Sequence, residues 1–258
     1  MIKKNYQAWN VPEKSYDSNW SSSKKLKFYA RYGILAASGH NTQPWLLEIE
    51  KDALYIRINP DHHLSSDGSG LLSVEPYISI GTFLETFSLA ANGFGEEVKI
   101  SLPKSSDRVS KLEITGKMPP SKDLLEAIRT RTSNRNEFST KQLPRGLLDN
   151  LNKGSCEGVE SIVVSKAQDL KFISEQTALA INSIMSKPAY RHELSEWVRT
   201  NHTKKFDGMP GFTHGFGNIK SLFSKIAVRF APGGGPQAEK SRKLILNSSV
   251  LVIVSLEK

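Results

Sequence analysis

The amino-acid sequence predicts an α+β fold in which helices flank a central mixed or antiparallel sheet. Hydrophobic residues make up 38% and charged residues 24% of its 258 residues, which is the balance of a globular chain with a sizeable core. Helical and strand patterns do not alternate in regular βαβ units. Two strand-like runs, WLLEIE and ALYIRI, are separated by only two residues, which indicates a hairpin and therefore an antiparallel pair.

The first long helix is predicted over residues 24–38. Ser21 to Ser23 offer capping hydroxyls, and Leu26 and Tyr29 fall on one side at helical spacing. Gly39 is expected to end this helix, because glycine takes left-handed backbone angles without penalty. The hairpin follows after Pro44, with apolar side chains alternating along its second strand.

A second helix is predicted from Ser73 to about Asn92, and it is apolar nearly all round, so we expect it in the core. Ser121 is expected to cap the third helix. The remaining elements follow from the same periodicities. Strands are predicted near 98–102, 111–115, 161–164 and 250–255, and helices near 121–128, after 144, and near 166–185, 189–200, 219–230 and 238–246.

The compartment is predicted from features that the sequence lacks. The first ten residues contain no apolar core of a signal peptide, and the late apolar run 250–254 is too short to span a bilayer. Cys156 is the single cysteine, which excludes an intrachain disulfide. We therefore expect a cytoplasmic protein without a membrane partner.

The net charge of +9 is concentrated late in the chain. Residues 187–243 contain eleven Lys and Arg against four Asp and Glu. This positive charge indicates either an ordinary solvated surface or a field that attracts an anion such as a phosphate cofactor. Aromatic residues do not alternate with the basic ones as in nucleic-acid-binding motifs, so we expect no nucleic-acid partner.

Two polar clusters are candidate binding segments. AASGHNTQPW, residues 36–45, places several hydrogen-bonding side chains in one short loop and returns at once to apolar residues. RTRTSNRNEF, residues 129–138, alternates Arg131, Ser133 and Arg135, which an extended segment would place on one side. Two guanidinium groups and a hydroxyl suit a phosphate, although a solvated charged turn has the same composition.

Together the two clusters resemble those of a known family. ASGHNTQPW resembles the APS-x-x-N-x-QPW segment of the flavin-dependent nitroreductase superfamily, and RTSNR resembles its R-x-S-x-R phosphate segment. Their order, and the later runs HELSEWVR and FDGMPG, are similar to the Acg-like branch. The resemblance covers about residues 24–255 and implies a single nitroreductase-like domain over residues 1–258.

The resemblance further implies a homodimer that binds FMN non-covalently at the subunit interface. Arg131, Ser133 and Arg135 would hold the phosphate and ribityl chain. The residues implied at the flavin ring and its loop are Ser38, His40, Asn41, Gln43 and Pro44. Of these, Asn41 would bond the polar edge of the ring, because its amide both donates and accepts, and Pro44 would fix the chain. For His40, an ordinary role in capping or packing explains the residue as well as a place at the flavin edge.

The implied reaction transfers hydride from NADH or NADPH through the flavin to a nitroaromatic, a quinone or a similar acceptor, in ping-pong order. Because the flavin carries the chemistry, no catalytic side chain is expected. No metal site is expected either, because His62 and His63 are sequence neighbours that point apart. One alternative is a flavin-sequestering protein whose lid-like excursion at about 187–235 excludes the nicotinamide. Another is a scaffold that binds no flavin.

The sequence departs from the family pattern at three places. The arginine segment follows the QPW loop, whereas it is N-terminal in most nitroreductases. Ala37 stands where a proline is usual. Family members continue beyond the last predicted strand with a glycine turn, a long helix and a basic stretch, so the C-terminal part of the family fold is expected to be missing.

Overall fold

The computed structural model describes residues 4–62, 64–65, 74–103, 107–139, 141, 143–151 and 158–256. Contacts within the chain divide it into two compact units. Unit 1 comprises Met1–Ser133 and His192–Arg229, and unit 2 comprises Asn134–Arg191 and Phe230–Lys258. The expectation of one domain over residues 1–258 stays a prediction.

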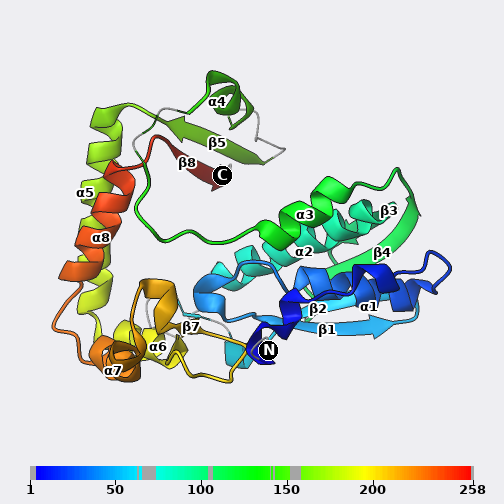
Figure 1. Cartoon of the computed structure of the whole chain (residues 1–258), viewed down its shortest axis with the longest axis horizontal. Helices are drawn as coiled ribbons and strands as arrows, with labels where there is room; N and C mark the ends of the chain where they lie inside the picture. The colour runs from blue at the N-terminus through cyan, green and yellow to red at the C-terminus, as the bar shows by residue number, and fades with distance from the viewer. Residues whose placement is uncertain are drawn as a thin grey trace. The chain divides into compact units, whose positions relative to one another are not determined.

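Unit 1 contains an antiparallel sheet, helices packed on it and a later excursion of the chain (Figure 1). Its first part has the elements η1 (Lys4–Trp9), η2 (Glu13–Ser15), α1 (Ser22–Gly33), η3 (Gly39–Asn41), β1 (Trp45–Glu50), β2 (Ala53–Ile58), η4 (Pro60–His62), α2 (Glu75–Gly93), β3 (Glu96–Ser101), β4 (Ser110–Lys117) and α3 (Lys122–Thr130). Helix α6 (Pro188–Trp197) leads into unit 1. The excursion continues through β6 (Val198–Arg199), β7 (Met209–Pro210), η5 (Gly211–His214) and α7 (Asn218–Arg229).

The sheet has four strands in the order β1-β2-β4-β3, and every neighbouring pair is antiparallel. The expected hairpin is confirmed, with Trp45 opposite Ile58 and Glu50 opposite Ala53. Lys51 forms the turn with a φ of +51°. This sheet, together with the helices, confirms the expected α+β class.

The core of unit 1 lies between the sheet and helices α1, α2 and α3. Four aromatic side chains, Tyr29, Tyr32, Phe83 and Phe87, have no exposed surface. Helices α1 and α2 approach so closely that a Cβ at Gly33 would lie 2.7 Å from the Phe83 ring. Large aromatic rings bury much apolar area, so this layer contributes most of the hydrophobic stabilisation of the unit.

A charged cluster is buried beside this core. The carboxylate of Glu96, whose side chain is 1% exposed, pairs with Lys25 at 2.7 Å and with Lys117. The Tyr16 hydroxyl donates to Glu96 over 3.1 Å. Burial alone would raise the pKa of Glu96, but the hydrogen bonds from Lys117 and Lys25 outweigh it and lower that pKa. The cluster therefore fixes a carboxylate inside the fold.

The structure corrects three details of the sequence analysis. Helix α1 ends at Gly33 rather than at 38, and Gly39 does not take left-handed angles. Its missing Cβ instead makes room, because a methyl there would lie 3.1 Å from Leu64 and 3.3 Å from the Glu75 carboxylate. Ser121 precedes α3 but makes no side-chain cap bond. Helix α2 is not buried on all sides as expected, since Ile78 is 62% exposed.

Unit 2 is built on one antiparallel strand pair and one helix pair. Its remaining elements are α4 (Arg145–Leu151), β5 (Val159–Val164), α5 (Ala167–Ser186), α8 (Gly235–Leu246) and β8 (Leu251–Leu256). Strands β5 and β8 pair with Ile162 opposite Ile253. Helices α5 and α8 pack closely where α8 begins, since a Cβ at Gly234 would lie 2.8 Å from that of Met185.

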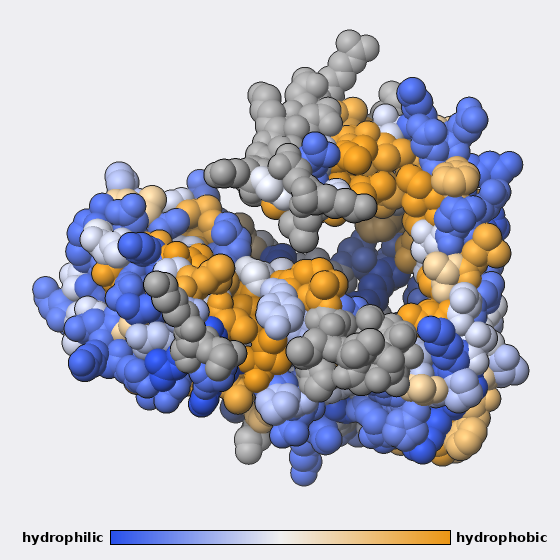
Figure 2. Space-filling view, turned by 180° about the vertical axis from the view of Figure 1, so that it is seen from behind, coloured by the Kyte–Doolittle hydropathy of each residue, from blue (hydrophilic) through white to orange (hydrophobic). Residues whose placement is uncertain are grey.

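No helix in the described part of the chain has the length and apolar character needed to cross a membrane. Hydrophobic side chains nevertheless reach the surface. Figure 2 shows them in orange among blue hydrophilic residues. Several large ones are more than half exposed, and α7 carries an unusual share of them. Cys156 and His63 lie outside the described residues.

Candidate functional site

The loop at residues 38–44 has an uncommon backbone. His40, Asn41 and Gln43 all adopt positive φ values, of 48°, 56° and 54°. Left-handed angles cost a non-glycine residue roughly 1–2 kcal/mol. The loop is held by side chains: Ser38 Oγ accepts from the Gln43 amide at 3.1 Å, and Ser79 Oγ accepts from the Gly39 amide at 3.2 Å. Strain that is fixed in this way is typical of functional sites.

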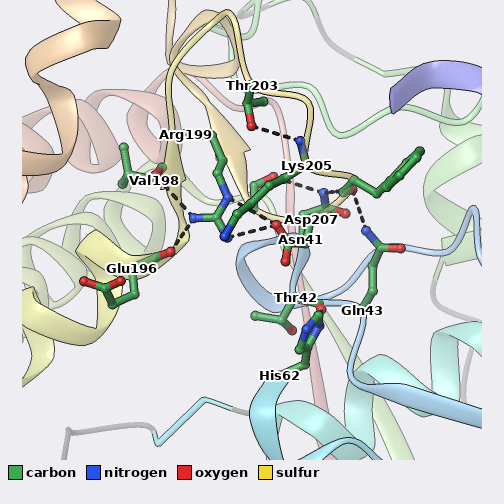
Figure 3. Close-up of polar contacts among 12 residues, drawn as sticks. Asn41, Thr42, Gln43, His62, Glu196, Val198, Arg199, Thr203, Lys205 and Asp207 are labelled. Atoms are coloured by element: carbon green, nitrogen blue, oxygen red, sulfur yellow. Dashed lines mark hydrogen bonds and ion pairs between the residues drawn. The ribbon is translucent and has the colours of Figure 1, made fainter. Parts of the chain in front are cut away.

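The segment 206–208 binds this loop, and we call their contact the clasp (Figure 3). Asn41 Nδ2 donates to the Gly208 carbonyl at 3.0 Å, and Gln43 Nε2 donates to the Phe206 carbonyl at 2.7 Å. The Gly208 amide donates back to the Asn41 carbonyl at 3.0 Å. Gly208 has a φ of +78°, and a Cβ there would lie 2.6 Å from the Trp197 carbonyl. Only glycine therefore fits this position.

An ion pair between Arg199 and Asp207 holds the segment that forms the clasp. Arg199 donates to Asp207 through Nε at 3.1 Å and through Nη2 at 2.9 Å. The two side chains are only 10% and 19% exposed. The Arg199 guanidinium also lies 5.6 Å from the Trp197 ring centre and donates to the carbonyl of Glu196. Because Asp207 lies between the two residues whose carbonyls accept from the loop, this pair positions the clasp.

His62 connects the loop to the end of α6. One ring nitrogen lies 2.7 Å from the carbonyl of Thr42, and the ring packs edge-on against Trp197 with centres 5.5 Å apart. Thr42 is 2% exposed and Trp197 is 8% exposed. The contact fixes the Thr42 carbonyl of the loop against the end of α6.

An open cavity of about 460 Å³ lies beside the clasp. Its lining residues are Gln43, Trp45, Asn59, His62, Lys205, Phe206 and Asp207. The cavity combines aromatic rings with amide, imidazole, ammonium and carboxylate groups, and its volume is within the range of small-molecule sites, about 300–1,000 Å³. These residues all belong to unit 1.

Two carboxylates, Glu75 and Glu193, lie near the start of the loop. Glu75 lies against Gly39, as its close approach to that residue shows. Burial raises the pKa of Glu75, and the neighbouring charge of Glu193 raises it further. Glu193 accepts from the hydroxyl of Ser65. No cluster of three metal-ligating side chains occurs within the described ranges.

The structure brings one residue of the arginine segment to the loop. Arg131 Nη2 donates to the Leu35 carbonyl at 3.1 Å, three residues before Ser38. Arg131 is exposed, and no described residue takes its remaining donors. Ser133 is exposed at the end of the same stretch of unit 1, whereas Arg135 belongs to unit 2. Convergence of all three on one phosphate stays a prediction.

The sequence analysis selected the loop but not its partners. The clasp depends on Phe206, Asp207 and Arg199. In the sequence these residues could be found only through the runs FDGMPG and HELSEWVR that contain them. The amide nitrogens of Asn41 and Gln43, assigned to a flavin and its loop, donate here to the chain's own carbonyls. Pro44 is buried, and its carbonyl accepts from the Asn59 amide at 2.9 Å.

No protein-family model matches the sequence, and a comparison with curated proteins finds no significant match. The resemblance to the nitroreductase superfamily therefore rests on the residue patterns alone. Assignments that derive from it stay predictions.

Proposed function

We propose that this chain binds FMN at the 38–44 loop and transfers hydride from NADH or NADPH to a nitroaromatic, quinone or similar acceptor. The proposal includes a nitroreductase-like fold, a homodimer and a cytoplasmic location. It is supported by the resemblance of the two motifs, by the α+β class and by the local geometry of the loop.

One observation carries the proposal. The two motifs are separated by about ninety residues in the sequence, yet Arg131 donates to the carbonyl of Leu35 where the loop begins. A phosphate segment and a ring-binding loop must lie close together to hold one nucleotide-like cofactor. The unused donors of the Arg131 guanidinium suit a phosphate, because its planar fork matches phosphate oxygens.

The residues around the loop fit a flavin in chemical type. The Phe206 ring, which is 55% exposed, offers flat apolar surface, and the amide oxygen of Gln43 has no partner among the described residues. An isoalloxazine needs such surfaces and a polar contact at its pyrimidine edge. The bound flavin would supply the hydride chemistry. Gln43 and Asn41 would orient it, and Phe206 would exclude water.

A second candidate function is flavin storage, and the clasp favours it. Asn41 and Gln43 already donate to Phe206 and Gly208, so the 206–208 segment lies over the loop that would hold the ring. A segment that stays closed over a flavin would slow its exchange and keep a nicotinamide away. The two candidates share the binding site and differ in whether a nucleotide can reduce the bound flavin.

The binding site is tested by titrating FMN fluorescence with the full chain and with Arg131→Ala. Loss of a charge-assisted contact costs about 1.5–3 kcal/mol, so the dissociation constant should rise roughly tenfold or more. Arg129→Ala is the matched control, because Arg129 is a nearby exposed arginine that pairs with Glu13. Equal affinity of all three proteins would remove Arg131 from the site.

The choice between enzyme and store is tested on FMN-loaded protein without oxygen. If the chain is an enzyme, NADH or NADPH should bleach the flavin absorption, and a quinone should restore it. A flavin that stays oxidised with both nucleotides would support storage and exclude the reductase.

A further inference from the structure

Helix α7 (Asn218–Arg229) presents its apolar side to the outside. Ile219, Leu222, Phe223 and Ile226 are 76%, 53%, 62% and 59% exposed. Their spacing of three, four and seven residues places them in one stripe along the helix. A surface helix normally buries such a stripe. In α7 the apolar side is exposed instead.

The inward side of α7 is small and polar. Ser221 and Ser224 are 0% and 4% exposed. Ser221 Oγ accepts from the Asn201 amide at 3.1 Å, and a Cβ at Gly211 would lie 2.6 Å from that of Ser221. Lys225 pairs with Glu196 at 2.9 Å. These contacts fix the rotation of α7 about its axis. The apolar stripe therefore points away from the residues of unit 1 that α7 contacts.

The stripe combines one aromatic and three branched aliphatic side chains, on the side of α7 opposite the buried Ser221 and Ser224. Phenylalanine and branched aliphatic residues on one side of a helix are typical of helices that lie in a membrane interface. We call the four stripe residues Ile219, Leu222, Phe223 and Ile226 the apolar ridge.

The charge around the ridge is positive. Lys220 flanks the stripe on one side and Lys225 on the other, at 100° per residue. Lys204, Lys205 and Lys220 are exposed and have no acidic partner among the described residues. Residues 192–229 contain six Lys and Arg against three Asp and Glu, so the net charge of this region is +3.

We propose that the apolar ridge docks unit 1 on an anionic lipid surface, with the helix lying in the interface. Lys220 would contact lipid headgroups, and Phe223 with the neighbouring aliphatic side chains would insert between acyl chains. Docking of a second copy on the same ridge would bring two regions of positive net charge together and is disfavoured by like charge. A helix that lies in the interface does not need the length of a membrane-spanning helix, so α7 can dock without crossing the bilayer.

Vesicle sedimentation with the full chain tests the docking. The vesicles contain equal parts of phosphatidylcholine and phosphatidylglycerol, and a second set contains phosphatidylcholine alone. The chain should sediment with the anionic vesicles and much less with the neutral ones. Phe223→Ser should weaken binding about tenfold, because a buried phenylalanine is lost. Lys220→Glu should weaken it severalfold, and high salt should act in the same direction.

Phe172→Ser is the matched control. Phe172 lies on α5 and is 62% exposed, the same fraction as Phe223, so a nonspecific hydrophobic contribution would affect both variants equally. Absence of sedimentation with anionic vesicles, or equal losses in the two variants, would overturn the proposal. Analytical ultracentrifugation that shows a dimer dispersed by Phe223→Ser would assign the ridge to a second copy and would likewise overturn it. Neither measurement depends on FMN.

Discussion

The Glu96 cluster and the clasp both join distant parts of the chain through polar groups, but they differ in burial. Glu96 is 1% exposed and is bonded by two lysines and a tyrosine. In the clasp, Asn41 is exposed and Gln43 is partly buried, and both donate to backbone carbonyls. One cluster holds a carboxylate that is buried from water, with Lys25 at 10% and Lys117 at 65% side-chain exposure around it, and the other contains neutral amides whose partners water can replace.

This difference separates a structural role from a functional one. Opening the Glu96 cluster would leave a buried charge without partners, which costs several kcal/mol. Opening the clasp exchanges amide–carbonyl bonds for water bonds at a net cost of only about 1 kcal/mol each. The loop itself also stores backbone strain. The clasp is therefore the region that can open to admit a ligand.

Removing the buried carboxylate should have the largest effect. Glu96→Gln would leave Lys25, whose side chain is 10% exposed, without its counter-charge. We expect a loss of about 3–5 kcal/mol in the free energy of unfolding, measured by urea denaturation. Glu97→Gln, at the exposed neighbouring position, should change it by less than about 0.5 kcal/mol. Similar losses in both variants would contradict the structural role of Glu96.

The Glu96 carboxylate should also make the free energy of unfolding depend on pH. The folded pKa of Glu96 is lowered, so its contribution is complete above the unfolded carboxyl pKa of about 4.3 and is lost as pH falls through the lower folded value. Urea midpoints should therefore decline more steeply below about pH 4.3 in the natural chain than in Glu96→Gln. Parallel curves would show that Glu96 does not contribute.

Weakening the clasp should have a smaller and local effect. Asp207→Asn removes the charge that Arg199 binds, and we expect faster hydrogen exchange at the Gly208 amide, which donates to Asn41. The free energy of unfolding of Asp207→Asn should be lower by about 1–2 kcal/mol. Asp61→Asn, at an exposed loop position outside the clasp, is the control. Unchanged exchange at Gly208 would mean that Arg199 and Asp207 do not support the clasp.

Removing the Tyr32 hydroxyl should have the smallest effect on the free energy of unfolding. Its hydroxyl is buried without a partner among the described residues. Because an unsatisfied buried polar group is unfavourable, Tyr32→Phe should leave the free energy of unfolding unchanged or raise it by up to about 1 kcal/mol. A loss of stability in urea denaturation would reveal a hidden partner of this hydroxyl.

The sequence predicted the elements with clear periodicity and missed contacts between distant segments. The hairpin of β1 and β2 follows from local alternation, and so its two strands were predicted with the bounds that the structure has. The positive φ values of His40, Asn41 and Gln43 occur in a loop held by Ser79 and by the clasp, and no local pattern contains these contacts. Gly39 was expected to supply the left-handed angles, but it supplies space for Leu64 and Glu75.

The candidate site shows the same limit. Asn41 and Gln43 were recognised by their residue types, and the resemblance gave them a flavin as partner. The structure gives their amide nitrogens the carbonyls of Phe206 and Gly208, over 160 residues away. Arg131 was expected near the loop only because both segments resemble one family, and its bond to Leu35 provides the spatial support.

The most direct test of the account is the visible absorption spectrum of the purified chain after incubation with FMN and desalting. The account predicts a retained flavin spectrum, and loss of most of it in Arg131→Ala but not in Arg129→Ala. A colourless protein after desalting would contradict the proposal that the 38–44 loop and Arg131 form a flavin site.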